Sequence, residues 1–269
     1  MSVVLMTHGS PDSLDEMEPF LRNVMKHRAP TPEFVAEIKR RYATIGGRSP
    51  LMDVTREQAR LLSENLGVRV AVGALHGKPA IADAVASLGS DRVVGIVAAP
   101  HFSPITINAY RAALPAGAKF VECWHRQPAF LDAWASRVRG AGHVLFTAHS
   151  VPVKGAEPYP DQVRETIDGI AARVPGLNWD LAWQSRSPSP LPWLEPDVEA
   201  KTDELHADGV EHITVAPIGF VSDNVEIMYD LDQLHAEHAH RLRIKWTRLP
   251  MLNTDPLLIE ALAAAVRAA

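Results

Sequence analysis

The chain has 269 residues, of which 46% are hydrophobic and 22% charged, and its 27 basic and 32 acidic residues give a formal net charge of −5 at pH 7. These values are typical of a folded globular protein; they exclude disordered and fibrous chains and argue against a general nucleic-acid binder. The single cysteine excludes an internal disulfide and an iron–sulfur cluster held by four thiolates, so any metal must be held by His, Asp or Glu.

Short β-branched runs alternate with longer amphipathic stretches almost from end to end, a pattern typical of parallel sheets covered by helices. The predicted strands, in chain order, are 3–7, 68–73, 92–98, 143–147, 180–183 and 212–216. The predicted helices are 32–42, 55–67, 80–88, 128–138, 159–173, 197–207 and 257–267. The Pro-rich stretch 185–196 is interpreted as an ordered loop, because it mixes a tryptophan and leucines with its prolines.

Two pairs of segments in the chain resemble each other. LMTHGSP at 5–11 resembles LFTAHSVP at 145–152, and GIVAAPHFS at 95–103 resembles ITVAPIGFVS at 213–222. A duplication explains this echo, and so does the general similarity of short apolar strands. We predict an α/β fold with two similar domains, 1–140 and 141–269, each a parallel sheet flanked by helices. We expect the final helix, about 254–268, to be able to pack back on the first domain.

Histidines follow four of the predicted strands. They are His8, His76, His101 and His149. In open α/β sheets the ligand lies beyond the carboxyl ends of the strands, so these positions face a binding site. A single histidine is more often structural than catalytic, but recurrence at four strand ends favours a functional role for at least one.

A row of acidic residues follows the strand 212–216. With Ser222 or Asp223 as the predicted helix cap, the residues Asp223, Glu226 and Asp230 fall at i, i+3 and i+7 on one helix face. They are interpreted either as a solvated face or as oxygen ligands for a divalent cation. The following run LHAEHAH, 234–240, is interpreted more readily as solvated surface than as an extension of a metal path.

The segment GGRSPL at 46–51 follows several basic residues. Its glycines permit close backbone approach, and Ser49 with Arg41 is suited to holding a carboxylate through charge-assisted hydrogen bonds. The chain contains no GxxxxGK[ST], GxGxxG or GxSxG at a strand-to-helix turn. Nucleotide hydrolysis, hydride transfer and serine hydrolysis therefore lack their usual motifs.

Six segments spread over nearly the whole chain resemble the ferrochelatases, specifically the water-soluble bacterial branch that acts on coproporphyrin III. They are RRYATIGGRSPL, APHFS, FTAHSVP, EPYPDQ, WQS followed by PWLEPDV, and APIGFVSDNVEIMYDLD. The resemblance implies two Rossmann-like domains of the chelatase type with a porphyrin cleft between them. It implies a lyase of haem biosynthesis that takes Fe²⁺ as a substrate and has no tightly bound cofactor.

The resemblance also implies roles for individual residues. His149 and Glu226 correspond to the catalytic, metal-binding pair, and Asp230 to an acidic position on the metal path. The positions that match porphyrin contacts are Arg41, Tyr42, Ser49, Tyr110 and, by its PWL context alone, Trp193.

Three positions depart from the family pattern. His8 stands where this branch usually has a tyrosine that can ligate iron, and imidazole can do the same. Met25 and Lys26 replace a pair of arginines, which leaves Lys26 as a weaker propionate contact, and Leu234 replaces an outer acidic residue.

The segment 18–41 is polar and basic, which favours coproporphyrin III, a substrate with four carboxylates, over protoporphyrin IX at an apolar entrance. No apolar run is long enough to span a membrane and the start of the chain does not resemble a signal peptide, so we expect a cytoplasmic monomer without membrane or nucleic-acid contacts. Transient contact with other haem-pathway enzymes is compatible with such a monomer. The alternatives are a protoporphyrin IX ferrochelatase, a sirohydrochlorin-type chelatase, or a non-catalytic haem- or tetrapyrrole-binding protein with His8 as its iron ligand.

Overall fold

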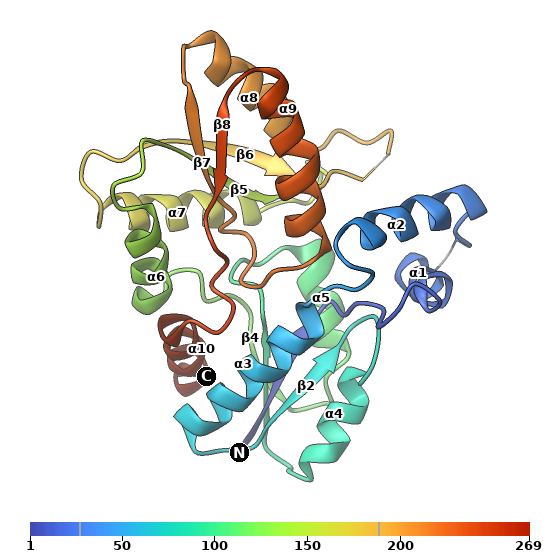
Figure 1. The fold of residues 1–269 in the computed structure, drawn as a ribbon. Helices are drawn as coiled ribbons and strands as arrows, with labels where there is room; N and C mark the ends of the chain where they lie inside the picture. The colour runs from blue at the N-terminus through green and yellow to red at the C-terminus, as the bar shows by residue number, and fades with distance from the viewer. Residues whose placement is uncertain (27, 188) are drawn as a thin grey trace.

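Two four-stranded sheets, each with helices against it, make up the computed structural model, which describes residues 1–26, 28–187 and 189–269 (Figure 1). The strand orders are β2-β1-β3-β4 and β6-β5-β7-β8, and the neighbouring strands in both sheets run parallel. The strands are β1 Ser2–Thr7, β2 Val70–Ala74, β3 Val93–Val97, β4 Lys119–Val121, β5 His143–His149, β6 Asn178–Gln184, β7 His212–Ala216 and β8 Lys245–Arg248. The predicted fold class is confirmed.

Helices connect successive strands, and a final helix follows β8. They are α1 Met17–Met25, α2 Pro32–Thr44, α3 Leu51–Leu66, α4 Ile81–Leu88, α5 Pro104–Ala112, α6 Pro128–Val138, α7 Tyr159–Ala171, α8 Val198–Ala207, the π-helix η1 Glu226–His235, α9 Ala236–Arg241 and α10 Pro256–Ala268. Within the described residues, no helix combines the length and the apolar character needed to cross a membrane.

The sequence missed five short elements, one of which is α9 in the run 234–240 that was interpreted as solvated surface. All six predicted strands are present, but β4 and β8 were not predicted, because each is a short strand at the edge of its sheet and has no buried apolar run. The helices α1 and α5 were missed as well. The predicted loop 185–196 is tied to the chain beyond β5 by backbone bonds from Leu194 N to Val151 O and from Val153 N to Pro192 O, although its residue 188 lies outside the described part of the chain.

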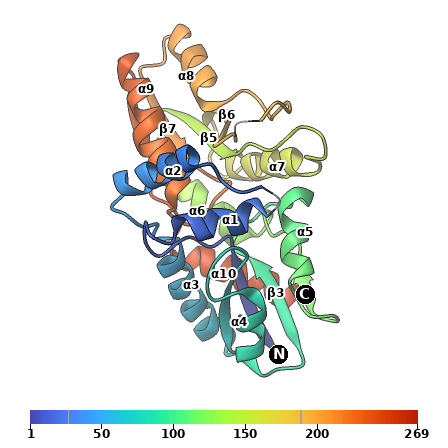
Figure 2. The same cartoon turned by 90° about the vertical axis from the view of Figure 1, so that its right-hand side faces the viewer.

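One buried apolar cluster joins the two halves of the molecule. It contains side chains from both sheets and from α3, α6 and α10. The helix α10 packs against α6 and α3, beside the first sheet, and presents Leu258, Leu262 and Val266 at a four-residue spacing. The helices α1 and α2 lie on the other side, at the right of Figure 1 and towards the viewer in Figure 2.

A buried histidine also connects the two halves. His101, which follows β3, is 3% exposed, and its Nε2 lies 2.9 Å from Thr166 Oγ1 on α7. Thr166 donates its own proton to Gln162 O, so the histidine is the donor in this bond. Its ring packs against the ring of His125, whose Nε2 bonds Glu165. Burial, with a smaller contribution from the nearby His125, lowers the pKa of His101 to about 3.

This burial predicts a loss of stability in acid. The unfolded chain takes up a proton on His101 near its ordinary pKa while the folded chain does not, so the free energy of unfolding should fall as the pH drops from about 6.5 towards 3. A His101→Gln variant keeps a donor for Thr166 and cannot titrate. Between pH 7 and 4.5, urea unfolding should show that the free energy of unfolding falls by about 2 kcal/mol more for the wild type than for this variant. Equal losses of unfolding free energy in the two proteins would contradict the attribution of the acid sensitivity to His101.

Candidate active site

The two residues predicted to be catalytic lie next to each other. His149 is the last residue of β5, and its Nδ1 donates to Ser150 O at 2.5 Å, which turns Nε2 towards Glu226. That Nε2 lies 3.5 Å from Glu226 Oε1, and the two side chains are 32% and 36% exposed. The pair therefore combines a fixed imidazole orientation with access from outside.

A π-helix presents Glu226. The helix begins at Glu226 itself, because Asn224 Oδ1 accepts from the backbone N–H groups of Glu226 at 2.9 Å and Ile227 at 3.3 Å. The predicted caps, Ser222 and Asp223, were wrong. Since π-helical turns are rare and occur frequently at functional sites, this element supports a functional role for its first residue.

The charges of the pair are coupled. Burial opposes a charge on His149, but the Glu226 carboxylate and the Ser150 carbonyl outweigh it and raise the pKa of His149. Burial likewise opposes ionisation of Glu226, but His149, with smaller contributions from His8 and Arg41, lowers the pKa of Glu226. Without substrate, the two side chains favour an ion pair.

Asp230 lies on the same helix, next to Arg41 and a serine that the prediction did not include. It is 6% exposed, Ser185 Oγ donates to its Oδ2 at 2.5 Å, and Arg41 Nη1 lies 3.9 Å from its Oδ1. Burial is the main cause that raises the pKa of Asp230 to about 6; Glu226 contributes to this rise, and the Ser185 bond opposes it. Ser185 in turn accepts from Gln184, which is held by Thr147. The WQS motif was the available signal for Ser185.

The predicted acidic row is shorter than expected. Asp223 precedes the helix, and its carboxylate contacts Arg248 at 3.4 Å and Asn253 Nδ2 at 2.7 Å instead of extending the row. His238, in the downstream run, bonds Asp203. Within the described ranges, no three His, Cys, Asp or Glu side chains gather into a ready-made metal cage.

The helix α2 brings two more predicted residues to η1. Tyr42 is 4% exposed, and burial together with the Glu226 charge raises its pKa. The guanidinium group of Arg41 lies 5.2 Å from the ring centre of Tyr229 and bonds Glu37 through Nε. The first half of the chain thus contributes a cation and a phenol close to Glu226.

The other predicted porphyrin contacts are spread more widely. His8 is exposed after β1, and Lys26 is exposed at the end of α1. Ser49 is buried, with its hydroxyl accepting from Leu51 N. Trp193 is half-buried and pairs with Pro152, three residues after His149. Tyr110 lies instead in the apolar core of the first sheet.

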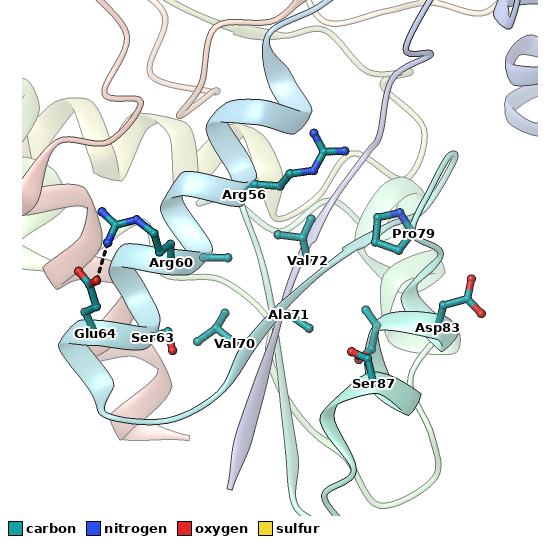
Figure 3. A pocket seen from close by; sticks show the side chains of 12 residues that line it. Arg56, Arg60, Ser63, Glu64, Val70, Ala71, Val72, Pro79, Asp83 and Ser87 are labelled. Carbon is teal, nitrogen blue, oxygen red and sulfur yellow. Dashed lines mark hydrogen bonds and ion pairs between the residues drawn. The ribbon is translucent and has the colours of Figure 1, made fainter.

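A groove of about 860 Å³ lies elsewhere, at the β2 edge of the first sheet between α3 and α4 (Figure 3). Its walls include Arg56, Arg60, Val72 and Asp83, and Arg60 pairs with Glu64 on the same helix. None of the predicted site residues lines it. The candidate site is therefore defined by the side chains at the strand ends and on η1.

Comparisons with known proteins agree with the sequence motifs. A family model described as Ferrochelatase matches residues 1–269. A protein of Acidobacterium capsulatum named ferrochelatase is 37% identical over 97% of this chain and 92% of its own length. One of Anoxybacillus flavithermus named coproporphyrin III ferrochelatase is 34% identical over 99% of this chain and 95% of its own length. The solved structure of SirB from Bacillus subtilis with Fe³⁺ has a similar fold, with a TM-score of 0.59 at 11% identity over 99% of this chain and 94% of that chain.

Proposed function

Because the chain belongs to the ferrochelatase family, we propose that it is a cytoplasmic enzyme that inserts ferrous iron into coproporphyrin III in haem biosynthesis. Some relatives are named for this substrate, as in Geobacillus kaustophilus at 33% identity, and others only for ferrochelatase activity. The family is shown by these matches, and the choice of porphyrin is argued from the residues.

The contact of 3.5 Å between His149 Nε2 and Glu226 Oε1 carries the proposal. Insertion requires that two pyrrole protons leave and that the iron exchanges its water ligands for ring nitrogens. An imidazole with a free Nε2 can accept a proton or bind Fe²⁺, and a carboxylate can do either as well. Because the two groups form an ion pair when no cation is present, an arriving Fe²⁺ displaces the proton on His149 and lowers the pKa of both ligands.

The small number of protein ligands suits a metal that is a substrate. The porphyrin supplies ring nitrogens, so the protein needs to hold the ion only until insertion. Asp230, fixed by Ser185 and facing Arg41, lies along η1 from Glu226 and is placed to receive or release a cation or proton there. This arrangement supports transfer and disfavours permanent storage.

The choice of porphyrin rests on charge. Lys26, Arg28 and Arg40 are exposed on or between α1 and α2, and Arg41 of α2 faces the site. Four carboxylates gain more from such a surface than the two of protoporphyrin IX, because each guanidinium or ammonium group adds an attraction that salt screens. The charges therefore favour coproporphyrin III.

The direct test is anaerobic insertion of Fe²⁺ into the two porphyrins at equal concentration. We expect kcat/KM for coproporphyrin III to be at least about tenfold higher, and the ratio to shrink as salt is raised. Preference for protoporphyrin IX would contradict the proposed substrate but leave the proposed reaction, iron insertion, unchanged. Absence of turnover, together with tight haem retention that is lost in His8→Ala, would make the chain a binding protein.

A further inference from the structure

His8 has the same local geometry as His149. Its Nδ1 donates to Gly9 O at 3.1 Å, just as His149 Nδ1 donates to Ser150 O, so Nε2 carries the lone pair when the ring is neutral. The strands that precede them, β1 and β5, occupy the same place in the two sheet orders. The first sheet thus presents an imidazole nitrogen in the same way as the second.

A second imidazole lies against His8. His76 follows β2, the neighbouring strand, and its backbone N–H donates to His8 O at 2.8 Å. The two ring centres are 4.9 Å apart with the planes at 57°. His76 is 7% exposed, and its Nδ1 is buried without a hydrogen-bond partner among the described residues. An unpaired buried nitrogen costs free energy, which coordination of a metal would recover.

The separation of the rings is compatible with a metal ion shared by the two imidazoles. With a metal–nitrogen distance of about 2.1 Å, the ion lies roughly 3.2 Å from each ring centre, and ligand angles between octahedral and tetrahedral then place the two centres about 4.5–5.2 Å apart. The observed 4.9 Å falls within this range.

We propose that His8 and His76 form a second divalent-cation site at the ends of β1 and β2. Within the described residues no third His, Cys, Asp or Glu completes it, so the other coordination positions are open to water and to substrate. The Glu226 carboxylate is near His8 and favours a cation there, whereas Lys26 opposes a cation beside His76. Such a site binds weakly and exchanges quickly.

Its role follows from its position. His8 and His76 follow strands of the first sheet, whereas His149 ends a strand of the second sheet. A cation at His8 and His76 therefore lies on the first-sheet side of Glu226. We assign to this site the role of holding Fe²⁺ before insertion. This role rests on the proposed function, but the binding of a cation does not.

The test uses the full chain without porphyrin and Co²⁺ as the probe. In a His149→Ala/Glu226→Gln background, Co²⁺ absorption and calorimetry should still show one ion bound. Adding His76→Ala or His8→Ala should weaken that binding by about tenfold or more, and combining the two should weaken it little further, since both rings hold one ion. His206→Ala, an exposed histidine of α8, is the matched control and should have no effect.

Paramagnetic Co²⁺ should also broaden the ring proton signals of His8 and His76 before those of His206. Unchanged affinity in both His76→Ala and His8→Ala would overturn the site. Because His8 is exposed, its variant keeps the test valid if His76→Ala fails to fold. Binding of Co²⁺ by a wild type that inserts no iron would refute the proposed function and leave the site standing, and the reverse result would refute only the site.

Discussion

Replacing His149 by alanine should lower kcat for Fe²⁺ insertion by about 10²–10⁴-fold, the range expected when a positioned proton acceptor is removed. Glu226→Gln should give a loss of similar size, because it keeps the shape of the side chain and removes the charge that faces His149 at 3.5 Å. The KM for the porphyrin should change little, since the propionate contacts proposed at α1 and α2 stay in place. Anaerobic stopped-flow fluorescence of the porphyrin measures both constants.

The pH profile separates a catalytic role from a structural one. Glu226 raises the pKa of His149, and the protonated ring can neither accept a proton nor bind Fe²⁺, so wild-type kcat should fall as the pH drops through this raised value. In Glu226→Gln the attraction is absent, and the residual activity should persist to lower pH. Full activity in either variant, or an unshifted profile, would refute the pair as the reacting groups. His206→Ala, with an exposed ring, should behave as wild type.

The sequence could predict the sheets and the candidate residue His149 for the same reason. Parallel strands buried on both faces appear as continuous apolar runs, and the residues that follow them lie at one edge of the sheet. His149 was found by that rule. Glu226 needed the family motif as well, because an acidic residue after a strand fits a solvated face equally well.

The parts that were missed depend on local hydrogen bonds. Nothing in the spacing of NVEIMYDLD indicates that Asn224 caps the helix or that its turns are π-helical, and Asp223 leaves the acidic row because Arg248, far along the chain, pairs with it. Ser185 reaches Asp230 from a backbone conformation with φ of 60°, which is rare for a residue other than glycine. Tyr110 matches a family motif, yet this structure places it in the core.

Gly9→Ala should have the largest effect on stability of any glycine-to-alanine change in the first sheet. A Cβ at Gly9 would lie 2.1 Å from the backbone oxygen of His76, and φ is +90°, so the ends of β1 and β2 would have to separate. Gly117→Ala is the matched control, because its φ is +82° but no atom of the described residues lies within 4 Å of its Cβ. The control should lose about 1 kcal/mol from backbone strain alone, and Gly9→Ala about 3 kcal/mol or more.

Urea unfolding of the two variants isolates the clash, because the strain from positive φ is common to both. The same displacement should move the His8 ring away from His76, since Gly9 O is the acceptor that fixes His8 Nδ1. Co²⁺ binding in the His149→Ala/Glu226→Gln background should therefore weaken with Gly9→Ala and stay unchanged with Gly117→Ala. Equal losses of stability would mean that the two strand ends separate without cost, and a pair of imidazoles held so loosely could not keep the spacing that a shared cation needs.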